Sequence, residues 1–86
     1  MVLECVRIKH VPNSVSERDL EDDWGDLTIS QNGIYFLQDR LYVFFNDKRD
    51  AEDAQNRGLS FNKKILKAKQ LRYPSTYFIL VSMLLI

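Results

Sequence analysis

Apolar and polar positions alternate near the start of the chain, and this period of two predicts a half-buried β-strand. In the segment LECVRIKHVP, one side carries Val6, Ile8 and Val11, and the other carries Cys5, Arg7 and Lys9. The strand is expected to end at Pro12. It would then hold basic side chains on one face of a sheet and apolar side chains on the other.

The next segment has the signals of a short helix from Ser16 to Trp24. Ser16 and Asp19 have the spacing of a capping box, and acidic residues crowd the first turns, where the helix dipole favours them. Leu20 and Trp24 lie four residues apart and can share one apolar stripe, and Gly25 stops the helix. We therefore expect an acidic, moderately amphipathic helix.

Residues 27–45 return to a pattern typical of β-strands. The runs LTIS and GIYFL are separated by the turn signal QNG, and a tight QDR connection leads from GIYFL into LYVFF. The last two runs therefore predict a hairpin.

A second helix is predicted in KRDAEDAQNRG, after Asn46 and Asp47, which are good capping residues. Ala51 and Ala54 would let this helix lie close to a sheet, and Gly58 would terminate it. A turn centred on Asn62 then leads to a last strand. Its inward residues are expected to be Leu66 and Ala68, and its outward residues Ile65, Lys67 and Lys69.

The resulting order, β-α-β-β-α-β, predicts an α+β fold of the ferredoxin-like sandwich type, in which two helices cover one face of a four-stranded antiparallel sheet. The other face stays open. Along LYVFF, Leu41, Val43 and Phe45 should lie under the helices, and Arg40, Tyr42 and Phe44 should lie on the open face. We expect this domain to span residues 1–72, followed by a hydrophobic segment over residues 73–86.

The length of the chain suits one small domain, because 86 residues are close to the size at which a single hydrophobic core becomes marginal. Twelve bases balance twelve acids, so no global charge favours nucleic acid or lipid. The charges are nevertheless segregated: residues 17–26 hold six acids and one base, and residues 63–72 hold five bases and no acid. This segregation indicates either two ordinary solvated faces or a basic edge that meets phosphate.

The open-face strands resemble those of the RNA recognition motif family, over roughly Leu3 to Leu71. The octamer QDRLYVFF, residues 38–45, matches the last four positions of the family's motif, which is basic, Gly, aromatic, Gly or Ala, Phe, Val, any, aromatic. The segment VRIKHV followed by Pro12 is similar to the family's first-strand motif, and NDKRDAEDA is similar to its usual entry into the second helix. The resemblance implies an RNA-binding sheet.

The chain departs from that pattern at two of three stacking positions. Arg7 and Arg40 stand where the family offers aromatic side chains, and only Tyr42 is retained. Asp39 and Leu41 also replace the glycine and the small residue of the octamer. One stacked base contributes about 1 to 3 kcal/mol, so two lost positions predict an affinity lower by about a hundredfold or more.

Arginine can compensate in part, because its guanidinium plane stacks on bases and its charge attracts phosphate. We therefore expect a basic platform around one aromatic side chain as the RNA-binding site. Its candidate residues are Arg7, Lys9, Arg40, Tyr42, Phe44, Lys67 and Lys69. The competing interpretation is that these charges are the ordinary polar residues of a solvent-facing sheet.

The segment YPSTYFILVSMLLI ends in ten residues that are all apolar except Ser82. Such a run is about half as long as a membrane-spanning helix requires, so integral membrane insertion is not expected. Three alternatives remain for residues 73–86: a helix or strand docked on the open sheet, a segment that binds another protein, or the stump of a longer chain.

No catalytic or cofactor site is expected. The fold also occurs in acylphosphatases, but the loop KHVPNSVS lacks the glycines of their phosphate loop. His10 has no orienting or metal-ligating neighbours in the sequence, and the single cysteine, Cys5, excludes an internal disulfide. No signal peptide is visible, and we expect a reducing compartment, the nucleus or the cytoplasm.

Two functions of different classes fit these observations. The first is a non-catalytic module that binds single-stranded RNA through the open sheet face. The alternative is a protein-interaction module that keeps the fold with little or no RNA binding, and whose protein partner contacts the sheet or the hydrophobic tail. An Arg-X-Phe motif is usual in relatives of the second kind, and NRGLSF does not have that spacing.

Overall fold

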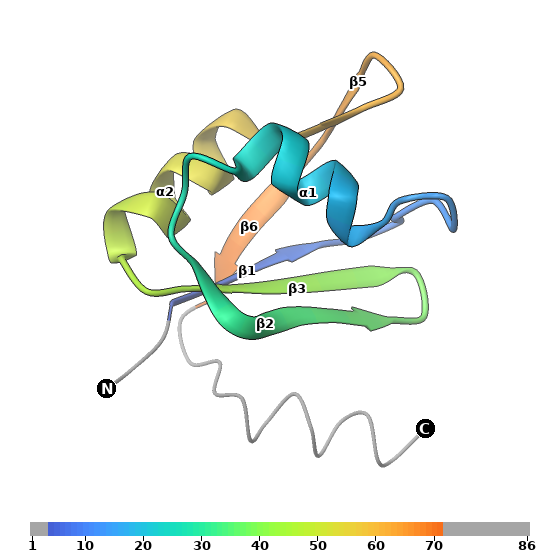
Figure 1. Cartoon of the computed structure of the whole chain (residues 1–86). Coiled ribbons are helices and arrows are strands. Elements are labelled where there is room, and N and C mark those ends of the chain that lie inside the picture. The colour runs from blue at the N-terminus through green and yellow to red at the C-terminus, as the bar shows by residue number, and fades with distance from the viewer. Residues whose placement is uncertain (1–3, 72–86) are drawn as a thin grey trace.

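The computed structural model describes residues 4–71, which form two helices, a four-stranded sheet and a separate two-stranded hairpin (Figure 1). In chain order the elements are β1 (Glu4–Ile8), α1 (Glu17–Trp24), β2 (Ile29–Leu37), β3 (Arg40–Phe45), α2 (Lys48–Arg57), β4 (Leu59–Phe61), β5 (Lys64–Leu66) and β6 (Ala68–Leu71). The main sheet has the strand order β2-β3-β1-β6, and every neighbouring pair is antiparallel. Both helices lie on one face of it, which confirms the predicted α+β sandwich.

The two helices begin where the sequence predicts, and for the expected reason. The Asp19 carboxylate accepts hydrogen bonds from the backbone N–H and the hydroxyl of Ser16, at 2.8 and 3.2 Å. The Asp47 carboxylate accepts from the backbone N–H of Arg49 at 2.8 Å. These bonds satisfy polar groups that a helix N-terminus otherwise leaves without partners.

The core lies between the helices and the sheet. It is formed by the inward-facing residues of the three longest strands and by the apolar stripes of the helices, and its fully buried members include Val6, Ile8, Leu20, Trp24, Leu41, Val43, Phe45, Ala51 and Ala54. Trp24 packs on Phe45 with their ring centroids 5.8 Å apart. The predicted placement of Leu41, Val43 and Phe45 under the helices is therefore confirmed.

The QNG segment, residues 31–33, does not reverse the direction of the chain. Ile29 pairs with Phe45 and Ile34 pairs with Val43, so the residues between Ile29 and Ile34 form a bulge inside the single strand β2. Asn32 has a φ of 57°, a left-handed conformation that asparagine tolerates better than most residues. Asn32 thus has a turn conformation, but the strand continues because β3 supplies partners on both sides of the bulge.

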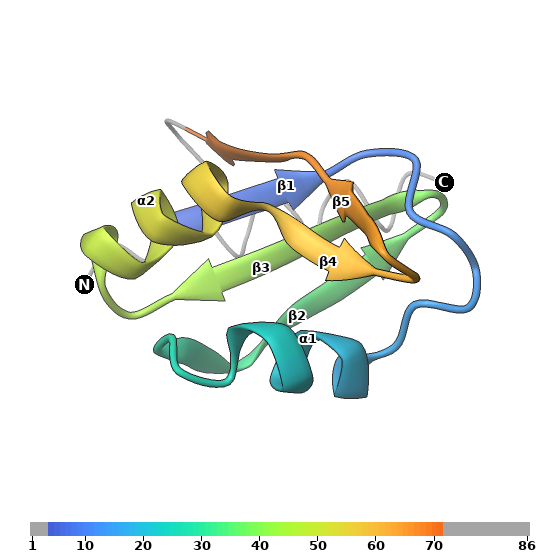
Figure 2. The same cartoon turned by 90° about the horizontal axis from the view of Figure 1, so that it is seen from above.

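The last predicted strand is divided in two. Residues 64–66 pair with β4 to form the β4–β5 hairpin, and residues 68–71 pair with β1 as β6. Asn62 and Lys63 both have positive φ angles, 49° and 63°, which is typical of a tight two-residue hairpin turn. Seen from above, the hairpin lies on the same side of the sheet as the helices, and β4 runs from the end of α2 (Figure 2).

Candidate nucleic-acid interface

The face of the sheet away from the helices carries a row of four side chains, one from each strand. Tyr35 pairs with Tyr42, Tyr42 with Arg7, and Arg7 with Lys69. Directly opposed residues in antiparallel strands point to the same side of the sheet. The fold therefore places three of the predicted site residues, Arg7, Tyr42 and Lys69, next to one another.

A second row crosses the same face and is apolar. Phe44 pairs with Cys5, and Cys5 pairs with Leu71. Gly33 lies beside Phe44, because a Cβ built on this glycine would come within 3.1 Å of the Phe44 Cβ. This face is thus apolar where β3 ends and basic where β1 ends.

The two predicted aromatic site residues are buried. Phe44 has no exposed surface and Tyr42 is only 7% exposed. The Tyr35 ring packs edge-on against Phe44 with the centroids 5.8 Å apart, and Leu37 and Leu71 also pack against this cluster. Both side chains lie on the predicted face, and little of either ring is exposed for stacking in this structure.

The basic candidates are arranged differently from the aromatic ones. Lys9, Arg40, Lys67 and Lys69 are all exposed, whereas Arg7 is half-buried. The Nε atom of Arg7 is buried and has no hydrogen-bond partner among residues 4–71. A buried guanidinium N–H without an acceptor is unfavourable, and a ligand would satisfy it only after a movement of the Arg7 side chain.

Most of these bases surround one groove, which we call the basic groove, with a volume of about 610 Å³. It lies beside the end of β1 and the passage from β5 into β6. Its lining residues are Arg7, Lys9, His10, Ile65, Leu66, Lys67, Ala68 and Lys69. No acidic residue of the described chain is among them, so the groove attracts anions.

Sequence reasoning missed the groove's apolar wall, although it placed the lysines nearby. The wall comes from β5 of the β4–β5 hairpin, where Ile65 is 63% exposed and Leu66 is half-buried. The signal for this hairpin was the pair Asn62 and Lys63 between two short apolar runs. His10 also lines the groove, and its Nδ1 atom lies 3.4 Å from the Asp39 carboxylate.

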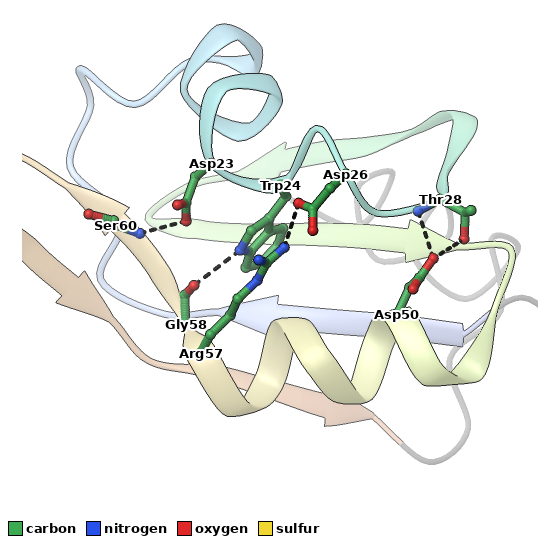
Figure 3. A network of polar contacts seen from close by, with 8 residues as sticks. All are labelled: Asp23, Trp24, Asp26, Thr28, Asp50, Arg57, Gly58 and Ser60. Carbon is green, nitrogen blue, oxygen red and sulfur yellow. Dashed lines mark hydrogen bonds and ion pairs between the residues drawn. The ribbon is translucent and has the colours of Figure 1, made fainter.

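Polar contacts hold the hairpin and α2 in position against α1 and the loop that follows it (Figure 3). The Trp24 indole N–H donates to the Gly58 carbonyl at 3.0 Å, and the Ser60 N–H donates to the Asp23 carboxylate at 2.9 Å. At the far end of α2, the Asp50 carboxylate accepts from both the N–H and the hydroxyl of Thr28, at 2.8 and 2.6 Å. The β4–β5 hairpin, which forms the groove wall, is therefore fixed against α1.

The Arg57 guanidinium donates to the Asp26 carboxylate at 2.8 Å, which lowers the pKa of Asp26 below 3.8 and raises the pKa of Arg57.

Within residues 4–71, no group of three or more His, Cys, Asp or Glu side chains is placed to hold a metal ion. Burial raises the pKa of the Cys5 thiol to about 12, so this thiol is a packing residue. Over the same part of the chain, no helix is long and apolar enough to cross a membrane.

No family model matches the chain, and no curated protein matches it in sequence. Solved structures do match. A crystal structure of G-rich RNA sequence binding factor 1 from Homo sapiens has a TM-score of 0.76 and 15% identity, and covers 99% of this chain and 96% of that one.

The Glorund qRRM2 domain has a TM-score of 0.71 and 20% identity, and covers 83% of this chain and 91% of its own. The chain has the fold of an RNA recognition motif. At these identities the likeness establishes the fold, and the evidence on function comes from the residues of the interface.

Proposed function

We propose that this RNA-recognition-motif fold is a non-catalytic module that binds single-stranded RNA through the sheet face and the basic groove. The observation that carries the proposal is the groove itself, in which four Lys or Arg side chains meet with no acid among the lining residues. Arg40, exposed on β3, adds a further base to the same face. Such an RNA ligand would place the module in the nucleus or the cytoplasm.

In this proposal phosphate contacts carry most of the affinity. Tyr42 and Phe44 are buried, so stacking on them requires a rearrangement of this face, whereas the lysines are accessible as they stand. Lysine and arginine attract the RNA backbone whatever its sequence. We therefore expect binding that depends steeply on salt and weakly on base sequence.

The test is fluorescence anisotropy of the full chain with a labelled ten-nucleotide oligouridylate, repeated over a range of salt concentrations. Each phosphate contact to a single strand contributes about −0.7 to the slope of log K against log salt. Replacing both Lys67 and Lys69 with alanine should therefore make the slope shallower by about 1.4.

The matched control replaces Arg18 and Arg49 with alanine. Both are exposed bases of α1 and α2, and the control changes the net charge by the same amount. It should leave the slope unchanged. Equal effects of the two double variants, or no binding at low salt by the folded wild-type chain, would refute the proposal.

A second candidate function is supported by the buried aromatic cluster. Tyr42 and Phe44 are packed with Cys5, and this arrangement suits a protein-interaction module that does not stack bases. This function predicts that a folded chain shows no salt-dependent RNA binding, and that a protein ligand binds with little salt dependence. The salt titration above therefore separates the two candidates.

A further inference from the structure

Arg7 occupies an unusual position in the sheet. On the face away from the helices it lies between Tyr42 of β3 and Lys69 of β6, and it also lines the basic groove. Its side chain is half-buried, and its Nε atom is fully buried with no acceptor among residues 4–71. A structural arginine at such a place normally donates to a carboxylate or a carbonyl.

The charges around Arg7 also lack compensation. Like charges directly opposite each other across antiparallel strands repel, and Arg7 faces Lys69 in this way. Within the described chain only two ion pairs form, His10 with Asp39 and Arg57 with Asp26, and neither includes a lysine or arginine of the groove. An anion bound between Arg7 and Lys69 would satisfy the orphan donor and remove this repulsion.

We propose that Arg7 and Lys69 form a subsite for one phosphate group, in which the Arg7 side chain turns so that its Nε–H, buried in this structure, donates to a phosphate oxygen. The inference rests on the proposed function and goes beyond it by naming the group that is bound and the atom that binds it. Phosphate suits this position, because a guanidinium presents its Nε–H and an Nη–H in one plane and can donate to two phosphate oxygens at once. The ammonium of Lys69 supplies a second charge on the other side.

The direct test is a two-dimensional NMR spectrum of the arginine Nε–Hε groups, recorded on the full chain. The Arg7 signal is assigned by its loss in Arg7→Lys. Three probes are titrated at low salt: inorganic phosphate, a five-nucleotide oligouridylate with a 5′ hydroxyl, and the same oligonucleotide with a 5′ phosphate.

With each probe the Arg7 Nε–Hε signal should move, and the Arg18 and Arg49 signals should stay in place. A larger affinity for the 5′-phosphorylated oligonucleotide would assign the subsite to a terminal phosphate. Equal affinities of the two oligonucleotides would assign it to an internal phosphodiester. An Arg7 signal that does not move with any probe would overturn the subsite.

Two variants test whether binding depends on the geometry of the Arg7 guanidinium or only on its charge. Arg7→Lys keeps the charge but loses the Nε–H, and it should bind the oligonucleotide about tenfold more weakly, which is the value of one hydrogen bond to a charged group. The control Arg49→Lys makes the same change on α2 and should bind like the wild type. An affinity of Arg7→Lys equal to that of the control would show that charge alone acts there.

The subsite and the proposed function fail in different ways. If the oligonucleotides do not bind but inorganic phosphate still moves the Arg7 signal, RNA binding is wrong and the phosphate subsite stands. If the oligonucleotides bind with steep salt dependence while the Arg7 signal stays in place, RNA binding stands and the subsite is wrong.

Discussion

Replacing Trp24 with phenylalanine tests how strongly the β4–β5 hairpin and α2 are tied to the first helix. The indole has no exposed surface, its N–H donates to the Gly58 carbonyl at 3.0 Å, and its ring packs on Phe45. Phenylalanine keeps part of the ring contact. It loses the hydrogen bond and leaves part of the indole volume empty.

The loss can be estimated from these contacts. Gly58 is buried, so its carbonyl would be left without a partner, at a cost of about 1 to 3 kcal/mol. The space left by the smaller ring adds about 1 kcal/mol, which gives a total loss of about 2 to 4 kcal/mol in the free energy of unfolding. For a domain of this size, a loss of this magnitude lowers the midpoint of thermal unfolding by about 10 to 25 °C.

The assay is thermal and urea unfolding of the full chain, followed by circular dichroism. Phe36→Leu is the control, because Phe36 is 40% exposed and its truncation should change the free energy of unfolding by less than about 0.5 kcal/mol. If the Trp24→Phe midpoint matched that of the control, the indole contact with Gly58 would not support the fold, and the reasoning would be refuted.

Three further predictions follow from single contacts. Gly58→Ala should lower the unfolding midpoint, because Gly58 has a φ of 68° and an added Cβ would lie 2.7 Å from the Leu66 carbonyl oxygen; an unchanged midpoint would contradict this. Because the Arg57 contact lowers the pKa of Asp26, its stabilisation is present at neutral pH and lost as the pH falls through 3.8 and below. Urea midpoints of wild type and Asp26→Asn should therefore differ at neutral pH and converge near pH 2, and a constant difference would argue against the ion pair. The Cys5 thiol, buried and with its pKa raised to about 12, should resist iodoacetamide at pH 8 in the folded chain and react after unfolding in guanidinium; rapid labelling of the folded chain would disprove its burial.

Local patterns were sufficient to predict most of the fold. The alternation in LYVFF placed Leu41, Val43 and Phe45 under the helices, and the structure confirms this. The capping residues Ser16 and Asp47 marked both helix starts. These signals are reliable because side-chain direction and backbone capping depend on residues only a few positions apart.

The errors arose where pairing partners decide the structure. QNG has turn chemistry, but β3 provides partners on both sides of it, so the result is a bulge within β2. The last apolar run reads as one strand, yet its first part pairs with β4 and its second part with β1. A sequence window cannot distinguish these outcomes, because the partner strands lie elsewhere in the chain.

The amino-acid sequence by itself determined the order of elements from β1 to α2 and the face of the sheet on which Arg7, Tyr42 and Phe44 lie. Only the tertiary structure decided which of these side chains are accessible. It gathered Arg7, Lys9, Lys67 and Lys69 around one groove and buried Tyr42 and Phe44. The physical reason is that period and capping are local properties of the chain, whereas exposure depends on what packs over a side chain after distant segments have come together.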